Sequence, residues 1–186
     1  MDVVSHWLWG AALTRGKVKA RYSGMMGVLP DLCAFVPSSI YIFATGGERV
    51  KVTDETVTSD FPEIAWQMYQ ISHSAIWMGL AFLFCWAWFH YRGVPKWMDS
   101  VFIEKGDARS CAWLLWLPWL AHIAVDIPSH AIQFFPTPFL MPISDWMFDG
   151  IRWSTPAVFF TNVALLIITW SLLLYREKKQ NSMSDH

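Results

Sequence analysis

Long apolar stretches separated by short polar segments dominate this chain. Four of them approach the roughly 20 residues that a helix needs to cross a bilayer, and they lie at Tyr22–Ala44, Ile64–Tyr91, Cys111–Ile127 and Pro156–Tyr175. A fifth run, Val3–Leu13, is too short to cross, and we expect a half-helix that dips into the bilayer or packs on the others. The pattern predicts an all-α, polytopic membrane bundle of about four spanning helices plus this N-terminal half-helix.

Two segments modify this picture. The stretch Gly24–Ser38 contains two glycines and two prolines, which predicts a broken helix whose freed backbone groups are covered by protein or water. The segment Glu177–His186 is polar, so we expect a disordered tail. Residues 1–176 are therefore predicted to form a single membrane-embedded helical domain.

Composition and charge exclude several classes of protein. The chain is 54% hydrophobic, with 13 Trp and 13 Phe, which is too apolar for an ordinary soluble domain. Its net charge of -1 gives no reason to expect a nucleic-acid partner. The three cysteines are scattered and form neither a disulfide framework nor a metal-binding CxxC pair.

The placement of charge predicts an orientation. Basic residues gather in three segments, Arg15–Arg21, Arg92–Arg109 and Arg176–Lys179. The loop after Ala44 is acidic, and the loop after Pro128 has almost no Lys or Arg. Because cytoplasmic loops carry an excess of Lys and Arg, the three basic segments, and with them the C-terminus, are predicted to lie in the cytoplasm.

Ionisable residues occur inside the apolar stretches, where they are costly and usually functional. His122 and Asp126 are four residues apart, so a helix places them on one face. At a rise of about 1.5 Å per residue, His6, Asp31, His73 and His122 each lie about 14–16 Å from one membrane surface. Because the hydrocarbon core is about 30 Å thick, we expect these residues, with Asp126, to share one site near the middle of the bilayer.

These residue types favour a metal centre. Imidazole and carboxylate groups bind divalent ions such as Zn, Mn or Mg, with Zn favoured here. A buried carboxylate is costly unless it binds a cation. His130 lies one turn beyond Asp126, so we expect it to protonate a leaving group or to contact a head group. Other interpretations stay open: His6 at the membrane interface, Asp31 as a turn cap, and a His–Asp pair that only holds helices together.

Four short motifs occur in order between residues 4 and 140: Ser5-His6 before small apolar residues, Leu29-Pro30-Asp31, His73-Ser74, and His122-Ile123-Ala124-Val125-Asp126. The ordered set resembles the membrane-bound metal-dependent hydrolases, inner-membrane proteins of bacteria and archaea of which one branch is LexA-regulated. That family is distantly similar to zinc-dependent phospholipase C. The resemblance implies a hydrolase in the inner (plasma) membrane.

The chain departs from the family pattern at two positions. Cys33 stands where the family has the second Asp of Pro-Asp-x-Asp, and Met68 stands where it has the first His of His-Arg-Gly-x-Thr-His-Ser. A single metal, with or without His130 as a substitute ligand, and a scaffold that has lost catalysis are both open alternatives.

We expect an integral membrane hydrolase that cleaves a phosphoester of a lipid or lipid-linked substrate with a metal-activated water. The alternative from another class is a non-enzymatic protein that conducts protons or metal ions through the same His and Asp residues. A third is an assembly subunit in which these residues only pack helices.

Overall fold

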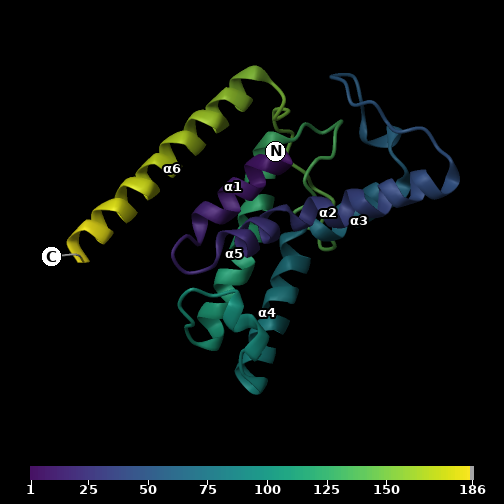
Figure 1. The fold of residues 1–186 in the computed structure, drawn as a ribbon. Coiled ribbons are helices and arrows are strands. Elements are labelled where there is room, and N and C mark those ends of the chain that lie inside the picture. The colour runs from purple at the N-terminus through teal and green to yellow at the C-terminus, as the bar shows by residue number, and fades with distance from the viewer. Residues whose placement is uncertain (185–186) are drawn as a thin grey trace.

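The chain folds into helices. The computed structural model describes residues 1–184, which contain six α-helices, two short 3₁₀ helices and no β-strand. The α-helices are α1 (Val3–Leu13), α2 (Ala20–Thr45), α3 (Glu63–Ser72), α4 (Ala75–Arg92), α5 (Ala108–Ser129) and α6 (Pro156–Ser184). Figure 1 shows α1 to α5 gathered into one bundle, with α6 running apart from them. The predicted all-α bundle is confirmed.

Three of these helices are long and apolar enough to cross a membrane. They are α2, α5 and α6, and the bent pair of α3 and α4 passes the same test as a fourth span. The short apolar helix α1 is the predicted half-helix. The chain is therefore a membrane protein by the length and composition of its helices.

The stretch predicted as one helix from Ile64 to Tyr91 is divided in two. α3 ends at Ser72 and α4 begins at Ala75, with a bend of 55° between them. Ser74 causes the new start, because its hydroxyl accepts hydrogen bonds from the amides of Ile76 and Trp77 and so caps α4. His73 lies at the bend, outside both helices.

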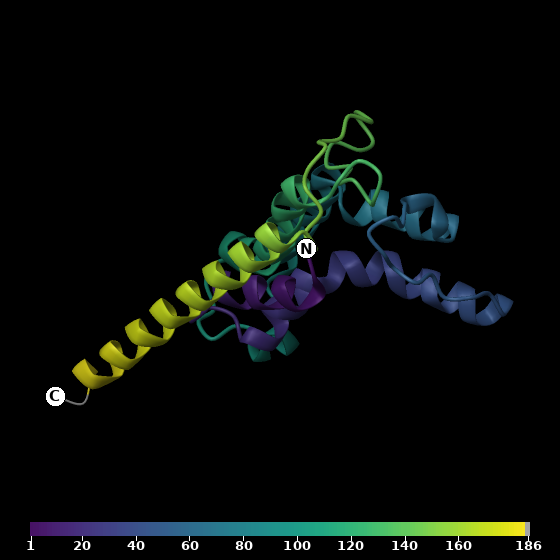
Figure 2. The same cartoon turned by 90° about the horizontal axis from the view of Figure 1, so that it is seen from above.

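The predicted break in the second stretch is wrong. α2 runs without interruption from Ala20 to Thr45 and contains both Pro30 and Pro37. Figure 2 shows the later part of this helix extending away from the other helices. Each proline removes one intrahelical hydrogen bond, and such a loss is tolerated in a spanning helix whose neighbours cover the freed carbonyl. Pro30 is fully buried, in agreement with this explanation.

α1 and α2 cross at glycines. A Cβ atom on Gly10 would lie 2.7 Å from the Ser23 carbonyl oxygen, and one on Gly27 would lie 2.5 Å from the His6 carbonyl oxygen. Such contacts are too short for any side chain, so only glycine permits this approach of the two backbones. Small residues serve the same purpose at other membrane helix crossings. The crossing holds His6 next to α2.

The loops gather at two ends of the bundle. At one end, the two basic connections pair through Lys19 N–H to Val101 O (3.0 Å) and Ile103 N–H to Lys17 O (2.8 Å). At the other, the acidic loop meets the segment after α5, where the Thr58 amide donates to the Gln133 carbonyl oxygen (3.0 Å). This is the grouping that the charge pattern predicts for two sides of a membrane.

α6 attaches to the bundle through α1. The Asn162 side chain donates to Ser5 Oγ (2.7 Å) and accepts from Trp9 Nε1 (2.9 Å). Arg15 forms a bidentate ion pair with Glu177 at 2.5 and 2.7 Å. α6 continues through Ser184, so the disordered tail expected from Glu177 onward is helical over its described part. Glu, Lys and Gln favour helix there, and 185–186 lie outside the described residues.

Candidate metal centre

The structure brings the predicted ligands together from separate elements. α1 supplies His6, α2 supplies Asp31, the bend between α3 and α4 supplies His73, and α5 supplies His122 and Asp126. All of them are buried, from 0% exposed for His73 and Asp126 to 9% for Asp31. The coincidence in depth that the sequence predicts therefore corresponds to a shared location in the fold.

Four of these side chains form a compact group. Ligand atoms of Asp31, His73, His122 and Asp126 all lie within 4.8 Å of one another. The two imidazole Nε2 atoms of His73 and His122 are 3.0 Å apart. His122 Nε2 lies 3.1 Å from Asp126 Oδ2, and His73 Nε2 lies 3.5 Å from Asp31 Oδ1. We call these four residues the tetrad.

Backbone and hydroxyl groups orient the two imidazoles. His122 Nδ1 lies 2.7 Å from the Gly27 carbonyl oxygen, which can only accept, so Nδ1 carries the proton. His73 Nδ1 lies 3.0 Å from Ser72 Oγ, and Tyr69 stacks on the His73 ring at 3.6 Å between centroids. Partners of this kind fix the tautomer and ring orientation of metal-binding histidines. The Ser72 hydroxyl donates to the Tyr69 carbonyl oxygen (3.5 Å), which leaves its own oxygen to accept from His73 Nδ1. We therefore assign Nε2 as the unprotonated nitrogen of both rings.

With that assignment, electron-rich atoms converge inside the tetrad. Two bare Nε2 atoms face each other and the two carboxylates, and no described residue supplies a hydrogen-bond donor to Asp126 Oδ2. Acceptors held at such distances repel one another, and a buried carboxylate oxygen without a donor is costly even though the other oxygen of the group, Asp126 Oδ1, is paired with the Met1 amine. A cation among the four would remove both penalties, and two imidazole nitrogens with two carboxylate oxygens suit a divalent metal. The tetrad could therefore hold a metal ion.

His6 borders the tetrad without joining it. Its ring stacks on His122 at 3.5 Å between centroids. Its Nε2 lies 3.1 Å from Asp126 Oδ1 but makes no hydrogen bond with a described residue. The Met1 amine lies 2.5 Å from the same carboxylate oxygen. His6 thus approaches the centre through Asp126.

His130 lies at the end of α5, beyond Asp126. Its Nδ1 is 3.2 Å from the Asp126 carbonyl oxygen and 3.6 Å from Asp126 Oδ1. His130 is also one of the residues that line a pocket of about 240 Å³ at this end of the bundle. His130 therefore stands between the tetrad and that pocket, where it can reach a bound molecule.

The two residues that depart from the family pattern do not complete the centre. Met68 packs against an aromatic cluster that includes Tyr69 and Phe135, both fully buried. Cys33 is half-buried on α2 and is not part of the tetrad. Tyr69 links the aromatic cluster to His73 by stacking. Packed aromatic side chains, and not an additional ligand, therefore lie next to His73 on the side of this cluster.

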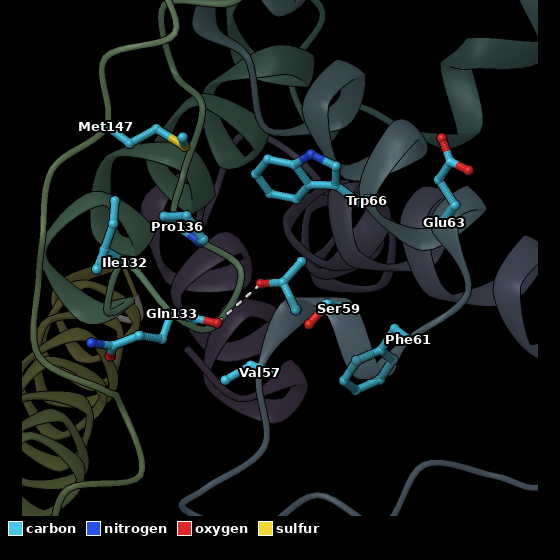
Figure 3. Close-up of a pocket in the computed structure, with 10 residues that line it drawn as sticks. Val57, Ser59, Phe61, Glu63, Trp66, Ile132, Gln133, Pro136 and Met147 are labelled. Carbon is cyan, nitrogen blue, oxygen red and sulfur yellow. Dashed lines mark hydrogen bonds between the residues drawn. The ribbon is translucent and has the colours of Figure 1, made fainter.

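A larger pocket of about 730 Å³ lies away from the tetrad (Figure 3). It lies between residues 57–66 and 132–147, and none of the predicted ligands lines it. Figure 3 shows Trp66 and Phe61 among its lining residues. The Thr58 hydroxyl donates to the Gln133 carbonyl oxygen at 3.3 Å. Its mostly apolar lining fits a packing groove better than a centre of chemistry.

Sequence reasoning missed the residues that support the tetrad. The Gly27 carbonyl carries no side-chain signal, and its role follows only from the crossing of α1 and α2. Ser72 and Ser74 flank His73 in the sequence, and a serine before an apolar run is a known helix-start signal. That signal could have located the bend.

Comparison of the chain with protein-family models, curated proteins and solved structures gives no match.

Proposed function

We propose that this protein is an integral membrane, metal-dependent hydrolase that cleaves a phosphoester of a lipid or lipid-linked substrate. The observation that carries the proposal is the tetrad, a buried group of two imidazoles and two carboxylates inside an apolar bundle. Ionisable groups at such depth mark functional sites in membrane proteins. The ordered motifs shared with the membrane-bound metal-dependent hydrolases support the same class.

Within this proposal, each residue has a defined part. Asp31, His73, His122 and Asp126 hold a divalent ion, with Zn favoured by the mixed nitrogen and oxygen donors and Mn or Mg as alternatives. When bound, such an ion lowers the pKa of water and stabilises negative charge on a phosphoryl oxygen. His130, between the tetrad and its neighbouring pocket, contacts the substrate.

The location follows from the charge pattern. The basic connections pair with each other at one end of the bundle, and Glu177 near the end of α6 binds Arg15 at that end too. By the positive-inside rule, we place this end and the C-terminus in the cytoplasm of a cell whose inner (plasma) membrane holds the protein. His130 and its pocket then face the outer side.

Metal analysis tests the first half of the proposal. The purified protein is loaded with Zn, Mn or Mg, and the bound metal is compared with that of the double variant His122→Ala, Asp126→Ala. We expect about one ion per chain in the wild type and almost none in the variant, because two of the four ligands are gone. His90→Ala is the matched control, since His90 is exposed on α4 and lies outside the tetrad. An equal amount of bound metal per chain in all three proteins would contradict the proposal.

Hydrolysis tests the second half. The metal-loaded protein is incubated with phospholipids and polyprenyl phosphates in mixed micelles, and released phosphate or phosphorylated head group is measured. We expect turnover that requires metal and disappears in the double variant but persists in His90→Ala. Metal binding without any turnover would limit the protein to a binding role.

One observation favours a centre over a conduction path. Between Cys111 and the tetrad, α5 carries no His, Asp, Glu, Lys or Arg from Ala112 to Ala121. A proton or ion path would need polar groups over that distance. Metal uptake into liposomes by the wild type would support the conduction alternative instead.

A further inference from the structure

The pocket beside His130 has a charged wall that the tetrad does not explain. We call it the His130 pocket, and it is lined by three short segments, 52–54, 129–134 and 152–154. It holds about 240 Å³. Because His130 lines this pocket and its Nδ1 lies 3.6 Å from Asp126 Oδ1, a molecule in the pocket lies near the proposed metal centre.

Arg152 is fixed in that wall by the backbone on both sides of it. The amide of Ile151 donates to the Pro128 carbonyl oxygen (3.0 Å), and the amide of Trp153 donates to the Ser129 carbonyl oxygen (2.9 Å). These bonds satisfy carbonyl groups that the end of α5 leaves free. A Cβ on Gly150 would lie 2.4 Å from the Pro128 carbonyl oxygen, so the close approach requires glycine. The arginine backbone is therefore held firmly against α5.

The Arg152 charge has no anionic partner among the described residues. Its guanidinium donates to the carbonyl oxygens of Thr53 (3.3 Å) and Thr56 (2.7 Å) and lies over the Phe134 ring at 4.9 Å. An arginine has five N–H donors, so some of them stay free for a further acceptor. Such a planar, always charged donor set recognises phosphate and carboxylate groups, and phosphate is the one that the proposed substrate carries.

Two other groups in the same pocket also lack partners. Ser129 Oγ is buried and makes no hydrogen bond with any described residue. Asp54 lies at the exposed edge and forms no ion pair or hydrogen bond within residues 1–184. The His130 pocket thus presents a cation, a buried hydroxyl and a separate anion to whatever enters it.

We propose that the His130 pocket binds a zwitterionic phosphodiester head group, with its phosphate at Arg152 and Ser129 and its amine at Asp54. The proposal rests on the proposed hydrolase function and names its substrate class, a phospholipid with an amine in the head group. A phosphate monoester would add a second negative charge opposite Asp54. A head group with neither phosphate nor amine would leave both Arg152 and Asp54 without a charged partner.

Binding of soluble head groups tests this assignment directly. Glycerophosphoethanolamine, glycerol 3-phosphate and inorganic phosphate are titrated separately into the detergent-solubilised protein, with and without metal, and heat or fluorescence is recorded. We expect glycerophosphoethanolamine to bind at least about tenfold more tightly than the other two, from one additional charge-assisted contact. Equal binding of all three, or tighter binding of phosphate, would overturn the proposal.

Two variants locate the site. Arg152→Gln is expected to weaken glycerophosphoethanolamine about tenfold or more, because the phosphate loses its cation. Asp54→Asn is expected to remove the preference over glycerol 3-phosphate while keeping phosphate binding. Arg49→Gln is the matched control, as Arg49 is exposed on the same loop outside the His130 pocket. Unchanged selectivity in Asp54→Asn would contradict the proposal even if Arg152→Gln fails to fold.

The result of the head-group binding experiment can be distinguished from the results that test metal binding and hydrolysis. Selective binding that depends on Arg152 and Asp54 in a protein without bound metal or turnover would support the head-group site alone. Metal binding and turnover with no head-group selectivity would keep the hydrolase proposal and reject this one.

Discussion

Gly27 has two roles in the structure. Replacing it with alanine tests both of them without changing any of the proposed metal ligands. Its Cα side faces α1, where an added Cβ would lie 2.5 Å from the His6 carbonyl oxygen. Its own carbonyl oxygen accepts the proton of His122 Nδ1 at 2.7 Å. Gly27→Ala therefore disturbs the orientation of one tetrad imidazole and leaves all four tetrad side chains unchanged.

The magnitude follows from the crossing distance. Ordinary van der Waals contact of a Cβ begins near 3.4 Å, so α1 and α2 must separate locally by roughly 0.9 Å to admit the methyl group at Gly27. Overpacking of this kind costs about 1–3 kcal/mol. Loss of an outer hydrogen-bond partner weakens metal binding about 10- to 100-fold. We expect both effects in Gly27→Ala.

The assay is a competition titration of Zn with a chromophoric chelator, alongside thermal unfolding in detergent. Gly79→Ala is the matched control, because Gly79 lies on α4 and a Cβ there meets nothing within 4 Å. That variant is expected to bind Zn like the wild type and to unfold no earlier, since alanine favours helix more than glycine. Wild-type Zn affinity in Gly27→Ala would refute the assigned role of the Gly27 carbonyl.

Three other substitutions test the framework around the centre. Ser74→Ala removes the cap of α4 and is expected to destabilise the protein by about 1 kcal/mol, measured by thermal unfolding; an unchanged melting temperature would contradict the capping role. Asn162→Leu removes two hydrogen bonds from α6 to α1, one of them to Ser5. We expect the substitution to lower stability by about 1 kcal/mol, measured by unfolding in a denaturing detergent. Wild-type resistance to that detergent would contradict a stabilising role for these bonds. The hydrogen bonds from Ser110 hold the pKa of Asp107 below its usual range, so the stability that its carboxylate gives α5 is present at neutral pH and is lost as the pH falls through that lowered pKa. The gap in melting temperature between wild type and Asp107→Ala should therefore narrow below about pH 4, and a gap that widens there would contradict this sign.

The depth of a residue in a membrane helix could be predicted from the sequence because the helical rise is constant. Counting from the ends of the apolar stretches placed His6, Asp31, His73 and His122 at one level, and the structure brings them close together. Depth fixes one coordinate only. The contact between His122 and His73 also needed the right rotation of two helices, which the count does not contain.

Local backbone chemistry accounts for what the sequence did not reveal. Glycine and proline spacing predicted a break in α2, yet the break lies near Ser74, where a serine side chain replaces the missing amide partners of a new helix. A proline costs a spanning helix one bond, whereas a capping serine supplies two. The bend, not α2, therefore gives His73 its position outside regular helix.

The bond between Asn162 and Ser5 joins residues 157 positions apart in the sequence. During synthesis, α1 leaves the ribosome before α2 to α5, and α6 follows after them. The bond from α6 to the helix that carries His6 therefore cannot form until α2 to α5 and the start of α6 have been made. Before that point, α1 can already contact α2 at the glycine crossing and α5 through the stacking of His6 on His122, without the bond to α6.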